Sequence, residues 1–310
     1  MLLFYSENPL TESCGQDPVE KNKFLLMPQS EYHKNIIDYY HSTEHAYKDS
    51  WDLNNSLAIH YGYWDEKVNS FPWSLLRMNE IMIEAAEIVP ADKVLDAGCG
   101  VGGSSIFIAN KIGSQVTGIS LTEKQVQQAN ENAKRQHITE LVQFKQMDYC
   151  RTDFPDAGFD VVWGCESICY ADSKEKFIKE AYRLLKPGGR LVVADGFVTD
   201  PKNKDDPIIR KWLDGWQVNY LESPEMFQQF MQQTGFENIS YRDISKYAMH
   251  SSRRLYKFYF LSNLYLLWKT LTFSNRATEM QKKNIEACKY QYYGMKKRLW
   301  QYGLIVGRKP

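Results

Sequence analysis

A glycine-rich loop follows a short apolar segment, and a carboxylate stands directly before the loop. Residues 94–105 read VLDAGCGVGGSS, so that Asp96 precedes the alternating glycines Gly98, Gly100 and Gly102. Glycines let the chain turn tightly and put no Cβ in the way of a ligand, as nucleotide-binding loops require. In dinucleotide-binding proteins such loops present backbone N–H groups to a pyrophosphate. Because Asp96 would repel that anion, the loop favours a ligand that carries a cation or an amine.

Apolar strands and helices alternate regularly around this loop. A first strand ends near residues 94–95, and residues 115–129 contain a second strand and the helix after it. The third strand lies within 144–149 and is expected to end at Asp148. The fourth strand lies within 159–167, and residues 184–197 contain a helix end, a turn and the fifth strand. Pro187 ends a helix before the fifth strand, and the two glycines after it permit the chain to reverse. This alternation predicts a parallel sheet with right-handed crossovers.

The rest of the chain predicts helical additions to that sheet. An N-terminal extension begins as an arm, a helix-rich aromatic segment covers 39–64, and a sixth and a last strand lie at 238–243 and 300–310. A helical insertion over 251–298 separates those two strands, and we expect it to stand as a lid over the carboxyl ends of the strands. The predicted division is an N-terminal extension and helical cap, a cofactor-binding core, and a lid insertion with the final strand, at 1–88, 89–250 and 251–310.

The most apolar stretch is aromatic and is interrupted by polar residues. It runs over 255–268, and Lys257 and Asn263 interrupt it. It is shorter than the roughly 20 apolar residues that a bilayer-spanning helix needs, so we expect no transmembrane segment. We expect a cover helix that faces the core; a wall of a hydrophobic cavity and contact with a membrane surface remain alternatives.

Composition narrows the class of protein. The 38 basic and 38 acidic residues give zero formal net charge, which disfavours a nucleic-acid partner. The six cysteines show no Cys-x-x-Cys spacing and predict free thiols in a reducing compartment. The N-terminus lacks a basic region ahead of its apolar residues, so no signal peptide is expected and a cytoplasmic location is favoured. The histidines and carboxylates form no ligand motif, so no metal is predicted.

The carboxylate followed by Gly-x-Gly-x-Gly resembles motif I of the class I S-adenosylmethionine (SAM) methyltransferases. The segments LAIHYGYWDE (57–66), GISLTEKQ, CES and GLIVGRKP are similar to the sterol, tocopherol and related small-molecule methyltransferases, and more distantly to the cyclopropane fatty acid synthases. The resemblance implies an α/β, Rossmann-like class I methyltransferase sheet, mostly parallel and seven-stranded, with a helical N-terminal extension and a helical lid insertion. It also implies SAM as the cofactor.

The resemblance distributes the parts of SAM over the loop and the second strand. Asp96 would hold the aminoacyl end, and Gly98 and Gly100 would let the backbone approach it. Most class I enzymes carry an acidic residue after the second strand to bind the ribose. Here that position is Ser120, and Gln125 in the following helix takes the ribose role by resemblance.

Aromatic residues and a further carboxylate complete the expected cofactor site. Tyr63 and Trp64, or Tyr61, resemble the family's cap over the methionine moiety, where an aromatic face near the sulfonium is favourable by about 0.5–2 kcal/mol. A packed aromatic cluster is the alternative for this segment. Asp148 suits the adenine amino group, with Tyr149 beside it, and a loop or helix cap is the alternative for Asp148.

Three residues are candidates for catalysis. Glu166 follows the fourth strand, where relatives place an acidic residue that steadies a carbocation or leads to its deprotonation; a position behind the cofactor or in a surface ion pair is the alternative. Tyr170 stands where many relatives carry histidine, and His60 is a further candidate. The many aromatic residues outside the sheet favour a small hydrophobic acceptor, isoprenoid, sterol-like or aromatic.

We therefore expect C-methylation of an isoprenoid or related lipid alkene through a carbocation. The alternative is O- or N-methylation of an aromatic natural product with Tyr170 or His60 as the reactive group. A non-catalytic SAM-binding protein is disfavoured by the presence of Asp96, the glycines and Asp148 together. A homo-oligomer is possible.

Overall fold

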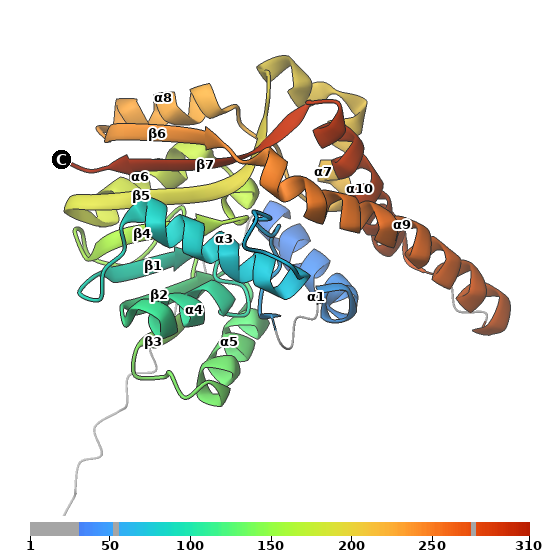
Figure 1. The fold of residues 1–310 in the computed structure, drawn as a ribbon, viewed down its shortest axis with the longest axis horizontal. Coiled ribbons are helices and arrows are strands. Elements are labelled where there is room, and N and C mark those ends of the chain that lie inside the picture. Colours follow the sequence, from blue (N-terminus) through green and yellow to red (C-terminus); the bar gives the residue numbers. More distant parts are fainter. Residues whose placement is uncertain (1–30, 52–55, 274–276) are drawn as a thin grey trace, which may run out of the picture.

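A single seven-stranded sheet forms the centre of the protein (Figure 1). The computed structural model describes residues 31–51, 56–273 and 277–310, so the expected N-terminal arm lies outside the described residues. The strand order is β3-β2-β1-β4-β5-β7-β6, with bounds β1 Lys93–Ala97, β2 Gln115–Ser120, β3 Val142–Gln146, β4 Phe159–Cys165, β5 Leu185–Val198, β6 Glu237–Asp243 and β7 Trp300–Arg308. The neighbouring strands β3, β2, β1, β4 and β5 are all parallel, and β7 pairs antiparallel with both β5 and β6. The predicted Rossmann-like, mostly parallel sheet is confirmed.

Helices cover both faces of this sheet because successive strand residues point to opposite faces. In β1, Val94 belongs to the core cluster on one face and Leu95 to the cluster on the other. The first face is covered by α3 (Phe71–Ala86), α4 (Gly103–Ile112) and α5 (Glu123–Arg135), and the second by α6 (Lys174–Leu184) and α8 (Pro224–Thr234). Both faces of the sheet are therefore buried under helices, as is usual for a parallel sheet.

A second group of helices stands beyond the sheet (Figure 1). It consists of α1 (Glu31–Trp51), α7 (Pro207–Gly215), α9 (Ser245–Phe273) and α10 (Glu279–Lys296), and short 3-10 turns lie at Ile168–Tyr170 and Pro201–Asp205. Helix α10 lies against α1, α7 and α9. Among the described residues, no helix has the length and apolar character needed to cross a membrane.

The sequence-based boundaries differ from the structure in three places. Within the aromatic segment 39–64, α1 ends at Trp51, and residues 57–64 have no helix or strand; we call His60–Trp64 the strap. Strand β3 ends at Gln146, two residues before Asp148. The helical insertion begins at Ser245, within the region assigned to the core, because α9 follows β6 almost directly. The division at 88 and 250 stays a prediction.

Helix α9 is a core-facing cover helix only in its first half. Leu255 is buried in the core, whereas Phe260 and the apolar residues beyond it are largely exposed. Figure 1 shows the end of α9 projecting beyond the body of the protein. The expectation of a cover helix is thus correct for one half and wrong for the other.

The contact between α7 and α10 depends on Gly215, where a Cβ would meet the Lys283 carbonyl and lie 2.7 Å from the Ala287 Cβ. Gly215→Ala should destabilise the protein by about 1–3 kcal/mol, because overpacking forces the two helices apart. The better helix propensity of alanine offsets at most about 1 kcal/mol. Thermal unfolding measures the change. Gly158→Ala, where a Cβ lies 3.4 Å from its nearest neighbour, is the control, and equal melting temperatures of the two variants would contradict the close contact.

Candidate active site

Two cavities meet at the carboxyl ends of the parallel strands. The chain enters β2 on one side of β1 and β4 on the other, so the strand order reverses there, and ligands of open α/β sheets bind at such a point. The loop cavity, of about 100 Å³, is lined by the glycine loop and by residues after β2 and β4. The apolar cavity, of about 600 Å³, lies under α1, α7, α9 and α10. Glu166 and Tyr170 line both cavities.

The glycine loop folds tightly over the end of β2. The N–H groups of Gly98 and Cys99 both donate to the Ile119 carbonyl at 2.9 Å. Gly98 has a φ of 91°, and a Cβ there would collide with Ser167, so packing of the chain itself requires this glycine. Gly100 has a φ of 52°, but a Cβ there would meet no atom within 4 Å. Gly100 lines the loop cavity, so its bare backbone is available to a ligand.

Asp96 is an almost completely buried carboxylate in the loop cavity. It is 2% exposed and accepts a hydrogen bond of 2.6 Å from the Ser105 hydroxyl of α4. Burial raises the pKa of Asp96 to about 6, against the stabilising effect of Ser105. A bound ammonium group would favour the ionised carboxylate further.

Ser120, Gln125 and His60 line the same cavity. The Ser120 hydroxyl donates to Gln125 Oε1 at 2.8 Å, so the two residues expected near the ribose lie together. His60 Nδ1 lies 3.0 Å from the Tyr61 carbonyl, and burial lowers the pKa of His60. Its Nε2 has no partner among the described residues. A neutral imidazole that donates from Nδ1 leaves Nε2 as a buried acceptor, which a ligand N–H or O–H can satisfy.

Tyr63 and Trp64 do not line the loop cavity, and their role as a cap over the cofactor stays a prediction. The Tyr63 N–H donates to the Ser74 carbonyl of α3, and the Trp64 N–H donates to the Tyr247 carbonyl of α9. These bonds hold the strap between two helices. The Tyr63 ring therefore stacks on Tyr247 at 4.1 Å and the Trp64 ring lies 3.8 Å from that of His250. The observed contacts of both residues are those of a packed aromatic cluster, the alternative for this segment.

Asp148 and Tyr149 lie in the turn after β3, and only one of them lines the loop cavity. Tyr149 lines the loop cavity and its hydroxyl donates to the Ser167 carbonyl at 2.7 Å. Asp148 is not part of the lining: it accepts from the Cys150 N–H at 2.8 Å and lies 3.9 Å from the His33 imidazole of α1. Burial raises the pKa of Asp148. Its adenine role stays a prediction, and the observed geometry is that of a turn-capping carboxylate.

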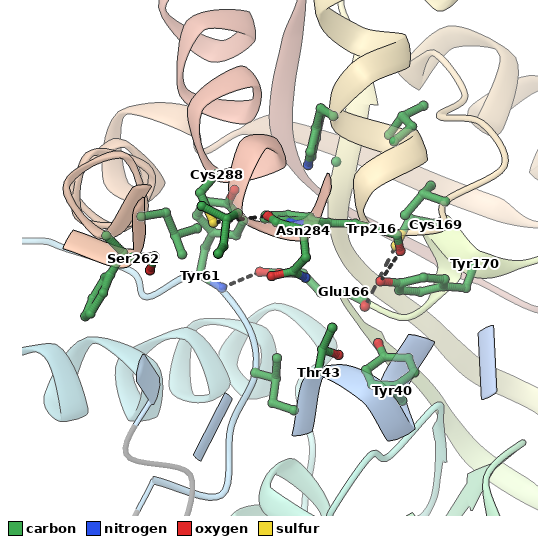
Figure 2. Close-up of a pocket in the computed structure, with 18 of the residues that line it drawn as sticks. Tyr40, Thr43, Tyr61, Glu166, Cys169, Tyr170, Trp216, Ser262, Asn284 and Cys288 are labelled. Carbon is green, nitrogen blue, oxygen red and sulfur yellow. Dashed lines mark hydrogen bonds between the residues drawn. The ribbon is translucent and has the colours of Figure 1, made fainter. Parts of the chain in front are cut away.

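Glu166 stands between the two cavities and is held by groups from distant segments (Figure 2). Its backbone lies in the left-handed region with a φ of 48°, and its N–H donates to the Ala194 carbonyl of β5. Its carboxylate accepts from the Tyr302 hydroxyl at 2.6 Å and from the Tyr61 N–H of the strap. Burial raises the pKa of Glu166 to about 8, although both hydrogen bonds favour the ionised form. The carboxylate's partners are thus a tyrosine hydroxyl and a backbone N–H, and no ion pair of Glu166 is found among the described residues; the alternative of a position behind the cofactor stays open.

Tyr170 contributes its ring more than its hydroxyl. The hydroxyl donates to the Trp216 carbonyl at 3.2 Å, and the ring packs 5.8 Å from that of Tyr40 in α1. Figure 2 shows Tyr170 beside Glu166, with Tyr40 below them. Because its hydroxyl already donates a hydrogen bond, Tyr170 contributes to the site mainly through its ring, which lines both cavities.

Two residues of the site were not found from the sequence. Asp195 lines the apolar cavity, accepts from the N–H groups of Cys169 and Gly196 at 2.8 and 2.7 Å, and has a pKa raised by burial. Its signal was present, since Asp195 follows an apolar run just as Asp96 does. Tyr302 has no such signal, because it reaches Glu166 only through the antiparallel pairing that sets it opposite Gly196.

No group of three or more His, Cys, Asp and Glu in the part of the chain that the structure describes is arranged to hold a metal ion. The expected absence of a metal stays a prediction.

The α/β sheet, the glycine loop at the point where the strand order reverses, and the buried Asp96 beside that loop are together typical of an enzyme that binds a nucleotide-containing cofactor. The methyltransferase domain model matches residues 95–193. The chain is 33% identical over 207 residues, 66% of its length and 76% of the other protein, to a 27-O-demethylrifamycin SV methyltransferase of Amycolatopsis mediterranei. It is 29% identical over 221 residues, 69% of its length and 58% of the other, to a sterol 24-C-methyltransferase of Kluyveromyces lactis.

Solved structures share the whole fold. A geranyl diphosphate C-methyltransferase from Streptomyces coelicolor superposes with a TM-score of 0.72 over 92% of this chain and all of the other, at 19% identity. This chain belongs to the class I SAM-dependent methyltransferases, in the group related to the sterol and tocopherol methyltransferases. It is a SAM-dependent methyltransferase, and its cofactor is SAM.

Gly100→Val and Gly113→Val form a matched pair that tests the loop. Both glycines have positive φ and open space around a Cβ, so backbone strain of about 1–2 kcal/mol is common to both variants. Only Gly100 lines the loop cavity, whereas Gly113 caps the end of α4. We expect Gly100→Val to abolish SAM binding in a calorimetric titration and Gly113→Val to retain it. Unchanged binding by Gly100→Val would remove the loop from the site.

Glu166 makes stability depend on pH. Its pKa of about 8 in the folded protein lies above the ordinary 4.5, so stability falls as pH rises from about 4.5 to about 8. Glu166→Gln cannot titrate and should lose less stability across that window, by on the order of 1–4 kcal/mol. Denaturant unfolding of the cofactor-free proteins at several pH values measures the difference. The exposed Glu237→Gln should follow the wild type, and parallel curves for Glu166→Gln would contradict the raised pKa.

Proposed function

We propose that this methyltransferase transfers the methyl group to a carbon of an apolar acceptor, an alkene of an isoprenoid or related lipid. The observation that carries the proposal is the half-buried Glu166 carboxylate, which lines both the loop cavity and the apolar cavity. The pKa of Glu166 is about 8 in the protein without ligand, and the positive charge of a bound cofactor would lower that pKa and favour the ionised form. The ionised carboxylate would then face any positive charge that develops on an acceptor during transfer.

The loop cavity fits the parts of SAM. Asp96 would hold the ammonium group, and the backbone at Gly100 would approach the aminoacyl end. The Ser120 and Gln125 pair would bind the ribose hydroxyls, and the unpartnered His60 Nε2 would accept one further hydrogen bond. When bound, the cofactor supplies a methyl group on a positively charged sulfur.

The apolar cavity fits a large, poorly hydrated acceptor. Its volume of about 600 Å³ lies within the range of small-molecule sites. Its walls are mainly aromatic and aliphatic, and include Tyr40, Trp212, Trp216, Phe258, Tyr265 and Trp300. The carboxylates Glu166 and Asp195 are the acidic groups of this lining, and Glu166 also lines the loop cavity, so an acidic group stands where the two cavities meet.

Glu166 would act on the cation and then on a proton. The cofactor would supply the methyl group to one alkene carbon and leave as the neutral thioether, so that a cation would remain on the acceptor. The Glu166 carboxylate stabilises that cation and accepts the proton lost from the neighbouring carbon, which restores a double bond. The raised pKa of Glu166 suits a base, and Tyr302 and the Tyr61 N–H fix its orientation.

O-methylation is the second candidate, supported by the similarity to a 27-O-demethylrifamycin SV methyltransferase. In that reaction Glu166 would remove the proton of an acceptor hydroxyl. His60 does not line the apolar cavity, and the Tyr170 hydroxyl already donates to Trp216. Glu166 is therefore the base that the geometry offers to either reaction.

Glu166→Gln should lower the single-turnover rate by on the order of 10²–10³, because one preorganised electrostatic partner is lost. The affinity for SAM should stay nearly constant. Tyr302→Phe keeps the carboxylate and loses one hydrogen bond, so a smaller loss is expected. Turnover of Glu166→Gln close to that of the wild type would end the proposed role.

Product analysis separates carbon from oxygen methylation. Incubation with methyl-labelled SAM and a panel of prenyl alkenes and phenols, followed by NMR of the product, locates the label. We expect it on a former alkene carbon, and label on oxygen alone would favour the second candidate.

A further inference from the structure

The outer half of α9 exposes a run of large apolar side chains. We call residues 260–268 the α9 tip, which lies in the part of the helix that projects from the body (Figure 1). Its side chains are between 52 and 65% exposed at Phe260, Leu261, Leu264, Tyr265, Leu267 and Trp268. Contiguous exposed apolar side chains of this kind mark interaction sites.

Positive charge accompanies this apolar surface. Helix α9 contains five Lys and Arg residues and no Asp or Glu, and α10 beside it adds four Lys and two Glu. The whole chain has zero formal net charge, whereas basic residues outnumber acidic ones on both of these helices. An anionic surface complements this charge, because Lys and Arg side chains are attracted to the negative surface potential of a bilayer that contains anionic lipids.

The charged and apolar residues share one face of the helix. Arg253, Lys257, Phe260, Leu264 and Leu267 follow one another at steps of four and three residues, and all five are exposed. Such steps keep side chains on one side of an α-helix. Along this face the helix is basic near the body of the protein and apolar toward its projecting end, so apolar side chains can enter a bilayer interface while the cations stay at the lipid head groups.

The same segment forms part of the apolar cavity. Leu261, Tyr265 and Leu266 line the cavity, while Leu264 and Leu267 do not. Whatever binds the α9 tip therefore contacts the wall of the cavity directly.

We propose that the α9 tip docks on the surface of a bilayer that contains anionic lipids, and that the apolar cavity takes its acceptor from that bilayer. Docking stands on the exposure and charge of α9 and is independent of the reaction. Delivery of the acceptor rests on the proposed function, since it requires an apolar acceptor.

Flotation with phosphatidylcholine vesicles, with and without phosphatidylglycerol, tests docking without any acceptor. We expect the full chain to float with the anionic vesicles, less with the neutral ones, and less at high salt. Failure of the methylation assays would leave this result unaffected. Absence of binding to the anionic vesicles would overturn the proposal.

Leu264→Glu/Leu267→Glu tests the apolar residues, and should weaken partitioning at least about tenfold because charge replaces buried apolar area in the interface. Arg253→Glu/Lys257→Glu should remove the preference for anionic vesicles. Met226→Glu, a partly exposed apolar position on α8, is the matched control and should bind as the wild type. Calorimetric SAM binding verifies that each variant is folded.

Two outcomes would contradict membrane docking by the α9 tip. One is flotation of Leu264→Glu/Leu267→Glu equal to that of the wild type. The other is a wild-type dimer in sedimentation velocity that becomes a monomer in this variant, because a second copy of the chain would then cover the tip.

Discussion

The half-buried Glu166 carboxylate at the end of β4 must receive hydrogen bonds from the protein, and much of the arrangement of the site follows from that requirement. Removing an ionisable group from water costs several kcal/mol unless hydrogen bonds replace its hydration. Glu166 receives them from the Tyr61 N–H, 105 residues earlier, and from the Tyr302 hydroxyl, 136 residues later. The strap, the end of β4 and the last strand are thereby held at one point, which is also the boundary of the two cavities.

The sheet topology explains why these segments meet. Parallel strands β1, β2 and β4 deliver Asp96, Ser120 and Glu166 to one edge, because their carboxyl ends coincide. Strand β7 runs the other way, so a residue near its beginning, Tyr302, reaches the same edge. An antiparallel last strand therefore adds a donor that a further parallel strand would place at the opposite end.

The added helices have a different task from those that cover the sheet. Helices α3 to α6 and α8 bury the sheet faces, whereas α1, α7, α9 and α10 enclose space for a ligand. The first set packs the two sheet faces and so fixes the strand ends that carry the site residues. The second set has one side on the cavity and another on the surface, so α9 connects the interior to the outside of the protein.

The sequence by itself determined the fold, the glycine loop and several site residues, because the features involved are local. Strand and helix periodicity, the φ > 0 glycines and the carboxylate before them all depend on neighbours in the chain, and Glu166 follows a strand that is readable from its own residues. Only the tertiary structure decided that Tyr63 and Trp64 face α9 and that Tyr302 donates to Glu166. It also decided that α9 is buried in one half and exposed in the other. These outcomes depend on which distant element packs against each side chain, and apolar periodicity is the same for a helix that faces a core, a cavity or a surface.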